Sequence, residues 1–499
     1  MNRDESLFQI RETPQWDVLV IGGGATGLGA ALDAASRGYR TALVERGDFA
    51  CATSSRSTKL IHGGVRYLRQ GNLTLVRDAL HERSHLLANA PALVHPLPFL
   101  IPAHSLAEKL YYAAGLKVYD ALAGRHGLQP SRLVSRAEAA EMAPTMDGLA
   151  GGVLYYDGQF DDARLAIALA QTLAEQGGAP LNYAPVTSLL RRRGRVAGAV
   201  IRDLESGADY EIAARVVINA TGIFSDALRQ LDDPTAPALI APSQGAHLVL
   251  PKSYLPGETA ILLPETADGR VLFAIPWQGR TLLGTTDTPR PVAEANPQPL
   301  AEEVAFLLEH AREYLGWTIQ PNDILSSYAG QRPLVKSAPD QTTAQLSRDH
   351  VVTVSSAGLV TILGGKWTTY RKMAEDTVDT ALQTAGLPQR ECRTASLRLA
   401  VAARIREEQG ELVHPRLPCR WPEIHRAVQQ EMARTLEDVL FRRTRAAILD
   451  AKAAAEAAPA IAAAMAGILG RDEAWQSSQV AAHRATTSTP QPRGARSPR

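Results

Sequence analysis

The pattern of apolar and polar positions near the beginning of the chain predicts a strand–helix–strand unit. Residues 17–21 form an apolar run typical of a buried strand, and a glycine-rich turn follows over residues 22–27. The alanine-rich stretch 29–38 favours a helix. A second apolar run over residues 41–44 ends at Glu45. This order is typical of the βαβ unit that holds a dinucleotide.

Each part of the unit suits that ligand. Gly22 permits the tight turn, and Gly24 lets the backbone approach a pyrophosphate. Gly27 lets the helix pack closely on the strand, and Glu45 can accept a hydrogen bond from a ribose hydroxyl. The N-terminus of the helix adds positive partial charge beside the pyrophosphate. The motif by itself does not separate FAD from NAD.

Later periodicities alternate strands and helices until the composition changes. We expect helices over residues 73–90 and 161–175. The expected strands cover residues 152–156, 181–190, 196–202, 210–214, 216–219, 271–275, 281–283, 351–354 and 360–363. From residue 367 onward the pattern is helical, and residues 400–466 are rich in Ala, Arg, Leu and Glu, which indicates a separate helical domain.

Composition and charge narrow the function classes. The 499 residues suffice for about two or three domains, and the net charge of +1 argues against a nucleic-acid-binding protein. The three cysteines have no paired or metal-ligand spacing, so we expect no metal and a reducing compartment. The first residues are polar and partly acidic, unlike a secretory or transit peptide. No apolar run reaches the ~18–20 residues that span a bilayer, so any membrane contact is expected to be peripheral.

Two further glycine junctions follow predicted strands. Ala220 and Gly222 come after one buried strand, and Gly365 and Lys366 come after another and open a helix. Each has an ordinary explanation as a loop between sheet and helix. Together with the first turn, they favour one extended FAD that passes several strand ends.

The stretch from residue 51 to 69 concentrates small hydroxyl side chains, a lysine, a histidine, two glycines and an Arg-Tyr pair. Such groups can bind a phosphate or a flavin edge, whereas the ordinary alternative is a solvated basic loop. The candidate cofactor contacts here, together with one further along the chain, are Thr53, Ser54, Lys59, Leu60, His62 and Val186.

Several motifs resemble one known family, the FAD-dependent, respiratory glycerol-3-phosphate dehydrogenases. The most specific are residues 51–68 and 364–372, and the similarity extends over roughly residues 16–475. The other segments that carry the resemblance are 22–27, 161–164, 284–287, 431–440 and 442–445. The three glycine junctions and Glu45 predict noncovalent FAD, and the resemblance implies oxidation of sn-glycerol 3-phosphate to dihydroxyacetone phosphate. Hydride would pass to flavin N5, and electrons would pass on to a membrane quinone.

The resemblance also implies an α/β fold. A glutathione-reductase-like FAD-binding Rossmann domain over residues 16–385 would be interleaved with a mixed-sheet substrate domain. The substrate-domain segments would be residues 91–155 and 235–345. A helical C-terminal cap would cover 386–478, and the polar residues 479–499 are expected to be a disordered tail. A homodimer in the cytoplasm, peripheral on the inner face of the cell membrane, fits this family.

The family motifs assign roles to five residues. His247 and Arg332 match its active-site histidine and arginine, and Arg66, Tyr67 and Lys366 match positions that meet the substrate, mainly its phosphate. These residue types suit the chemistry, because cations hold a phosphate and an imidazole can accept a hydroxyl proton. Arginine stays protonated, so His247 is the expected base, with a near-neutral pH limb.

Membrane association has two interpretations. Residues 106–125 carry Leu, Val and Tyr side chains interleaved with Lys and Arg, as in an interfacial amphipathic helix. A surface helix packed on the substrate domain fits the same pattern.

Two other function classes remain open at this point. An FAD oxidase would pass electrons to oxygen, from glycerol phosphate or another hydroxy or amino acid, and peroxide at stoichiometric yield would identify it. A non-catalytic or tRNA-modifying FAD-binding protein would share the N-terminal motif alone and would have no use for Arg66, His247 and Arg332.

Overall fold

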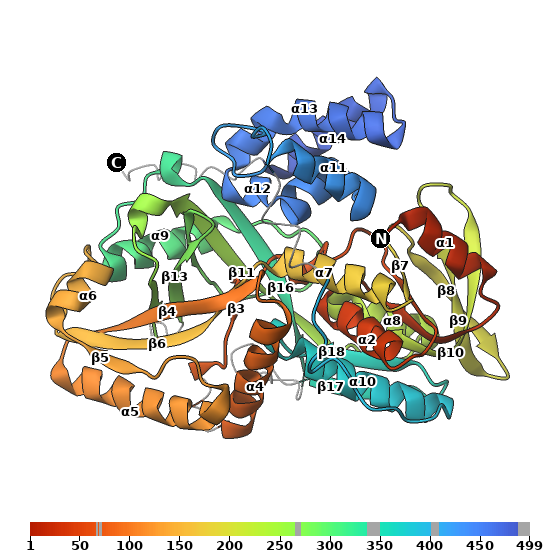
Figure 1. Ribbon diagram of the computed structural model, residues 1–499, viewed down its shortest axis with the longest axis horizontal. Helices are drawn as coiled ribbons and strands as arrows, with labels where there is room; N and C mark the ends of the chain where they lie inside the picture. The colour runs from red at the N-terminus through yellow and green to blue at the C-terminus, as the bar shows by residue number, and fades with distance from the viewer. Residues whose placement is uncertain (66–67, 69–71, 265–270, 337–349, 401–408, 488–499) are drawn as a thin grey trace.

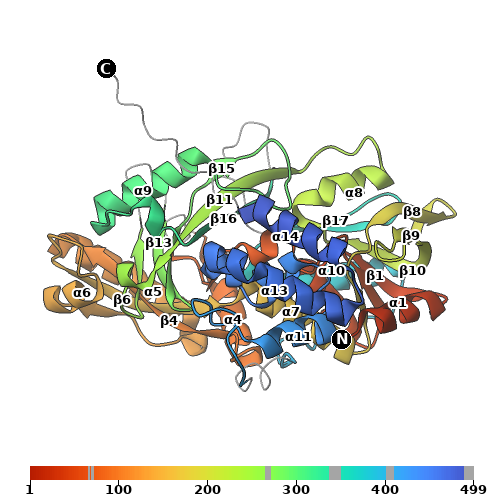
Figure 2. The same cartoon turned by 90° about the horizontal axis from the view of Figure 1, so that it is seen from above.

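Two β-sheets lie side by side, and helices from the end of the chain lie over the region between them (Figures 1 and 2). The computed structural model describes residues 1–65, 68, 72–264, 271–336, 350–400 and 409–487. We refer to the eight-stranded sheet as sheet A and to the ten-stranded sheet as sheet B.

Sheet A contains the predicted strand–helix–strand unit. Strand β1 (Trp16–Ile21) is the central parallel strand, between β10 (Asp209–Asn219) and β2 (Thr41–Val44). Helix α2 (Ala25–Ser36) follows β1 and packs against β1 and β2. Its other strands are β7 (Ala179–Leu181), β8 (Val186–Arg192), β9 (Arg195–Arg202), β17 (His350–Val354) and β18 (Val360–Gly364). The apolar runs of β1 and β2 are buried, as expected for parallel strands covered on both faces.

Sheet B is mixed, because strands β12 and β4 run parallel to each other while the other strand pairs of the sheet are antiparallel. Its strands are β3 (Leu60–Ile61), β4 (Val94–Ala103), β5 (Arg132–Val134), β6 (Gly151–Phe160), β11 (Ile240–Pro251), β12 (Ala260–Leu263), β13 (Leu272–Trp277), β14 (Arg280–Gly284), β15 (Thr288–Pro289) and β16 (Ser326–Val335). Most of them come from residues 91–155 and 235–345. The expected combination of a Rossmann-type sheet, a mixed sheet and a helical C-terminal region is confirmed.

The remaining helices flank the sheets or form the C-terminal layer. Those before residue 386 are α1 (Arg3–Glu12), α4 (Leu73–Asn89), α5 (Leu106–Ala123), α6 (Arg136–Met142), α7 (Asp162–Glu175), α8 (Ser225–Asp232), α9 (Ala301–Leu315) and α10 (Tyr370–Ala385). Short 3₁₀ turns are η1 (Thr53–Ser55), η2 (Gly124–His126), η3 (Gly222–Phe224), η4 (Lys252–Tyr254), η5 (Pro321–Asp323) and η6 (Trp367–Thr369). We call the C-terminal layer the helical cap. It comprises α11 (Trp421–Gln430), the π-helical turn η7 (Asp438–Arg443), α12 (Ala446–Leu449), α13 (Ala451–Leu469) and α14 (Glu473–Thr487).

Two local expectations differ from the structure. Residues 181–190 do not form one strand, because β7 ends at Leu181 and β8 begins at Val186. The two strands expected over 210–219 are one long strand, β10, which pairs with β1 along one part and with β9 along another. Burial alternates over residues 209–214, of which 209–213 pair with β9, and is continuous over 216–219, which pair with β1, so the change of pattern suggested two strands where one strand changes partner.

The end of the chain contains two corrections. Residues 479–487, expected in a disordered tail, belong to α14, whose Trp475 and Val480 pack against the core of the cap. Helix α13 is long and apolar enough to span a membrane by length and composition, contrary to the sequence estimate. Eight of its residues are nevertheless buried, and most of these belong to the cap core, as expected for a core helix. Residues 488–499 lie outside the described residues.

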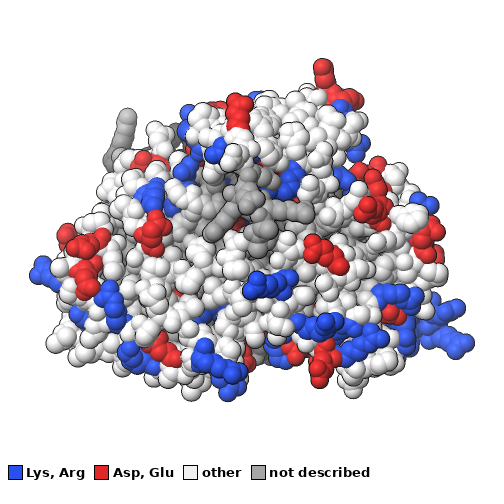
Figure 3. All heavy atoms as spheres, in the orientation of Figure 1, with Lys and Arg blue, Asp and Glu red and all other residues white. Residues whose placement is uncertain are grey.

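Acidic and basic side chains are interspersed over the face shown in Figure 3, in agreement with the net charge of +1. Buried ion pairs join the cap to the neighbourhood of sheet A. Arg443 contacts Asp48 through Nη1 at 2.7 Å, and Glu431 receives both terminal nitrogens of Arg164 at 2.7 and 2.8 Å. The cap is therefore fixed through charged groups as well as through apolar packing.

Candidate active site

One large cavity lies between the two sheets and is lined by residues of both. Its volume is about 1400 Å³, more than the about 300–1,000 Å³ typical of sites for drug-sized ligands. The predicted site residues that line it are Gly22, Gly24, Glu45, Thr53, Ser54, Leu60, His62, Val186, Ala220, Gly222, His247, Arg332, Gly365 and Lys366. The three glycine junctions therefore meet at one place, as an extended dinucleotide requires.

Two predicted residues, Gly27 and Lys59, do not line the cavity, and two others are not described. Gly27 lies behind the lining, where it allows close packing. Lys59 is fully buried, and its ammonium donates to the Asp162 carboxylate at 2.7 Å and to the Ser55 carbonyl at 2.9 Å instead of facing the cavity. Arg66 and Tyr67 lie outside the described residues.

The first glycine turn is shaped by close backbone approaches. Gly22 has φ +114°, and a Cβ atom there would lie 2.5 Å from the carbonyl oxygen of Ala220. A Cβ atom on Gly27 would lie 1.9 Å from the carbonyl oxygen of Gly22. Neither position can carry a side chain, so the N-terminus of α2 reaches the cavity wall. The residues present fit the pyrophosphate of FAD at this wall.

Glu45 lies at the end of β2 and is organised by backbone donors. The amide of Gly23 donates to Oε2 at 2.6 Å, and that of Gly47 donates to Oε1 at 2.9 Å. Burial raises the pKa of Glu45 despite these two hydrogen bonds. Each carboxylate oxygen keeps acceptor capacity, so the position fits a ribose hydroxyl.

His247 and Arg332 come from adjacent antiparallel strands, β11 and β16. The register pairs His247 with Tyr328 and Ser243 with Arg332, so the two side chains line the same cavity although 85 positions separate them. The His247 side chain is only 2% exposed, and its ring stacks on Tyr328 with centroids 4.8 Å apart. Its Nε2 lies 2.9 Å from Thr58 Oγ1, whereas Nδ1 is buried without a hydrogen-bond partner among the described residues.

The electrostatic environment keeps His247 neutral. Burial lowers the pKa of His247 well below its usual 6.5, and the positive charges of Lys59 and Arg332 lower it further, against the opposing effect of Asp162. A neutral imidazole at pH 7 is the form that can accept a proton. This direction would place the pH limb of His247 below the near-neutral range expected from the ordinary histidine pKa.

Arg332 is oriented by oxygen atoms on neighbouring segments. Its guanidinium lies 3.4 Å from the Asp287 carboxylate and donates at 3.2 Å to both the Thr285 hydroxyl and the Thr286 carbonyl. A Cβ atom on Gly245 would lie 2.5 Å from Arg332 Nη2, so glycine leaves room for this side chain. The arrangement holds a fixed positive charge beside His247.

Residues that follow the third glycine junction, at Gly365, form hydrogen bonds with the stretch 53–62. The indole of Trp367 donates to the Ser54 carbonyl at 2.9 Å. The His62 amide lies 3.3 Å from the Thr368 hydroxyl. Lys366 directly precedes Trp367 and lines the cavity, where a cation suits an anionic ligand.

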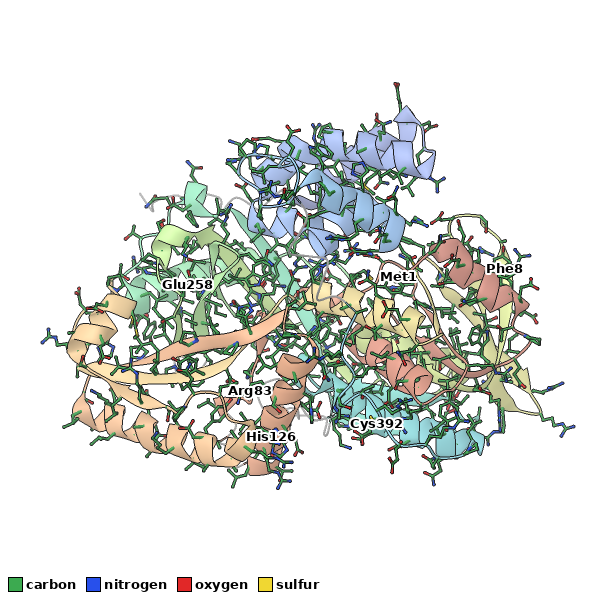
Figure 4. The ribbon with its side chains drawn as sticks, in the orientation of Figure 1. Met1, Phe8, Arg83, His126, Glu258 and Cys392 are labelled. Carbon is green, nitrogen blue, oxygen red and sulfur yellow. The ribbon has the colours of Figure 1, made fainter. Side chains whose placement is uncertain are left out.

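A second network supports the loop that precedes Arg66. The Asp157 carboxylate accepts hydrogen bonds from Arg83 at 2.7 Å, Tyr119 at 2.7 Å and the Gly63 amide at 3.3 Å. Arg83 lies close to His126 at one end of α4 (Figure 4), and the carbonyl of His126 accepts its Nη2 at 3.3 Å. The network joins α4, α5 and β6 under this part of the site.

Sequence reasoning missed the partners of the predicted residues. Thr58 and Tyr328, which hold the His247 ring, gave no sequence signal of their own. Asp162 was noted only within the expected helix 161–175 and within the segment 161–164 that carries the family resemblance. Within the part of the chain that the structure describes, no group of three or more His, Cys, Asp and Glu side chains is arranged to hold a metal ion.

Comparison with known proteins gives the class. A family model described as FAD dependent oxidoreductase matches residues 17–371, and one described as the C-terminal domain of alpha-glycerophosphate oxidase matches residues 360–476. The dinucleotide turn, the mixed sheet and the cavity between them thus define an FAD-dependent oxidoreductase, with FAD as the cofactor.

The relatives narrow this class. The chain is 41% identical to the human mitochondrial glycerol-3-phosphate dehydrogenase over 95% of its own length and 73% of that protein. It is 46% identical to the mitochondrial glycerol-3-phosphate dehydrogenase of Arabidopsis thaliana, over 80% of this chain and 66% of that one. A solved structure of the glycerol-3-phosphate dehydrogenase from Bacillus halodurans with FAD has a TM-score of 0.77 and 29% identity, covering 97% and 96% of the two chains. The chain belongs to the glycerol-3-phosphate dehydrogenase family, which confirms the resemblance.

Proposed function

We propose that the protein oxidises sn-glycerol 3-phosphate to dihydroxyacetone phosphate with FAD as cofactor. The observation that carries the proposal is that His247 and Arg332, on the adjacent strands β11 and β16, line the same cavity as the glycine turn. A neutral base and a fixed cation are what removal of a hydride and a proton from a secondary alcohol needs.

The chain supplies binding and proton chemistry. Bound FAD would supply the acceptor for the hydride that leaves carbon 2 of the substrate. His247 takes the hydroxyl proton in its neutral form, and Arg332 stabilises negative charge on the substrate oxygen. Lys366, with Arg66 and Tyr67, binds the phosphate, since a doubly charged anion needs fixed cations.

We also propose a membrane quinone as the electron acceptor, and peripheral association with the inner face of the cell membrane. The cavity wall extends to α5 through Tyr112, Leu116 and Val118. Leu106 and Leu110 of this helix are 67% and 53% exposed, and Tyr111, which also lines the cavity, is 61% exposed. Apolar and aromatic side chains exposed on an amphipathic helix suit an interfacial position, and an apolar wall that continues from them suits a quinone.

Oxygen is the competing acceptor. The L-alpha-glycerophosphate oxidase of Mycoplasma pneumoniae shares the fold with a TM-score of 0.58 at 17% identity. The exposed apolar side of α5 favours the quinone, because reaction with oxygen requires no such surface.

The test follows both acceptors with the purified holoenzyme. We expect glycerol 3-phosphate and a short-chain ubiquinone analogue to give dihydroxyacetone phosphate at many turnovers, with little peroxide in air. Liposomes are expected to retain the wild type, and a Leu106→Ser, Leu110→Ser variant, whose two positions do not line the cavity, is expected to remain in the supernatant with its activity on the soluble quinone intact. Stoichiometric peroxide without quinone reduction contradicts the dehydrogenase assignment.

A further inference from the structure

A buried carboxylate at the start of α7 gathers groups from three parts of the chain. Asp162 is fully buried. Its Oδ2 accepts the amide of Ser57 at 2.9 Å, the hydroxyl of Ser57 at 2.7 Å and the ammonium of Lys59 at 2.7 Å. Its Oδ1 accepts Arg445 Nη2, which belongs to the cap, at 2.8 Å. Arg445 and Lys59 also both donate to the Ser55 carbonyl, at 3.1 and 2.9 Å. Asp162 therefore fixes residues 55–59 at several points.

The segment that Asp162 fixes also holds the His247 ring. Thr58, between the two residues that bind Asp162, places its hydroxyl 2.9 Å from His247 Nε2. The carbonyl of Ser57 accepts the Tyr328 hydroxyl at 2.9 Å, and the Tyr328 ring is the one stacked on His247. The hydrogen bond with Thr58 and the stacked ring of Tyr328, whose hydroxyl is held by Ser57, thus set the position of the imidazole.

We propose that Asp162 is a positioning residue for His247, and that Arg445 makes the helical cap part of the same device. The proposal rests on the proposed function, in which His247 accepts the substrate proton. Its physical basis is that proton transfer requires the base within hydrogen-bond reach, and a displacement of about 1 Å can cost about 10²-fold in rate.

The charges suit this role better than a purely stabilising one. Burial tends to raise the pKa of Asp162, but the adjacent Lys59 and Arg445 lower it below its usual value, so the carboxylate stays ionised. A buried ion cluster contributes little net stability compared with apolar packing of the same volume, whereas it fixes geometry strongly. In this cluster, the hydrogen bonds of Asp162 to Ser57 and Lys59 fix the segment whose Thr58 contacts His247.

The test compares two variants of the cluster with a matched control. Asp162→Asn and the milder Arg445→Lys perturb the cluster. Glu431→Gln weakens another buried ion pair between the cap and α7, the one to Arg164, which does not contact residues 55–59. All three are prepared with FAD and mixed anaerobically with glycerol 3-phosphate in a stopped-flow spectrometer.

We expect Asp162→Asn to lower the limiting rate of flavin reduction about 10²-fold, while FAD content and the substrate concentration at half saturation stay near wild type. Arg445→Lys is expected to give a smaller loss, and Glu431→Gln to keep the wild-type rate even if it melts earlier. Thr58→Val provides the link: its effect and that of Asp162→Asn are expected to combine less than multiplicatively, because both act through one contact.

A second readout does not depend on the reaction. In protein with ¹³C-labelled histidine, the His247 signal, identified by its loss in His247→Asn, is expected to shift in Asp162→Asn and Arg445→Lys but not in Glu431→Gln. Equal rate losses in Asp162→Asn, Arg445→Lys and Glu431→Gln overturn the proposal. An unshifted His247 signal in Asp162→Asn and Arg445→Lys overturns it as well. A wild type that glycerol 3-phosphate does not reduce contradicts the proposed function, and the histidine signal still decides the positioning role. If Asp162→Asn does not fold, Arg445→Lys and Thr58→Val decide it.

Discussion

Replacing His247 with asparagine separates proton transfer from binding. The substitution removes the imidazole but keeps a polar side chain near Thr58. General-base catalysis is worth about 10²–10⁴-fold in rate, so we expect flavin reduction by glycerol 3-phosphate to slow by that factor. The lost stacking on Tyr328 costs about 0.5–1.5 kcal/mol of stability, which leaves the protein folded. FAD retention and binding of the substrate phosphate are expected to stay near normal, because both are assigned to residues other than His247.

The pH dependence has a definite sign. The pKa of His247 lies well below 6.5 because of burial, Lys59 and Arg332, with Asp162 opposing them. The rate of reduction in the wild type is therefore expected to be flat across neutral pH and to fall only at acidic pH, where the imidazole becomes protonated. In the unfolded chain this histidine binds a proton below about 6.5, while in the folded protein it does not. Stability is thus full above that pH and is lost as pH falls, by about 1.4 kcal/mol per unit until the folded-state pKa is reached.

The assay is anaerobic stopped-flow reduction from pH 5 to 8, together with thermal melting over the same range. His350→Asn serves as the control, because His350 pairs with Asp376 and does not line the cavity. We expect the control to reproduce the wild-type profile, and His247→Asn to lose both the acid limb and part of the acid destabilisation. A His247→Asn variant that reduces flavin at the wild-type rate refutes the assignment of the base, whereas loss of FAD shows a structural role instead.

Three further predictions concern the cofactor and the phosphate. Acid precipitation is expected to release yellow FAD into the supernatant, whereas a pellet that keeps the chromophore indicates covalent attachment, with His62 as the first candidate. Gly22→Ala places a Cβ atom 2.5 Å from a carbonyl oxygen at positive φ, so the purified variant is expected to lack FAD; Gly467→Ala, at a position with open space around it, is the control and is expected to be yellow. Lys366→Met and Arg66→Ala are expected to weaken glycerol 3-phosphate about ten- to hundred-fold and glycerol much less; equal losses on both substrates indicate an effect on the flavin or on folding.

The strand–helix–strand unit could be predicted because its signals are local. Buried parallel strands give continuous apolar runs, and the turn between β1 and α2 can only be made with glycines at Gly22 and Gly27. The same reasoning failed at residues 479–487, which were assigned to a disordered tail because the end of the chain is rich in polar residues. Tertiary packing of Trp475 and Val480 on α13 stabilises a helix there, and composition does not report such contacts.

The site was predicted in its parts and not in its geometry. That His247 and Arg332 meet depends on the antiparallel register of β11 and β16, which is set by the whole of sheet B. Lys59 was expected to bind the cofactor, because a lysine beside hydroxyl side chains suits a phosphate. Its partner Asp162 is 103 positions away, so only the folded chain shows that the ammonium turns inward.

The most direct test of the central claim is stoichiometric reduction of the bound flavin. Purified yellow protein is mixed without oxygen with sn-glycerol 3-phosphate, and the flavin absorbance and the product are measured together. The account predicts that one anaerobic mixing bleaches the flavin absorbance completely and yields one dihydroxyacetone phosphate per flavin. Glycerol at the same concentration is expected to cause no bleaching. A flavin that stays oxidised with saturating sn-glycerol 3-phosphate, yet is bleached by another hydroxy or amino acid, would contradict it.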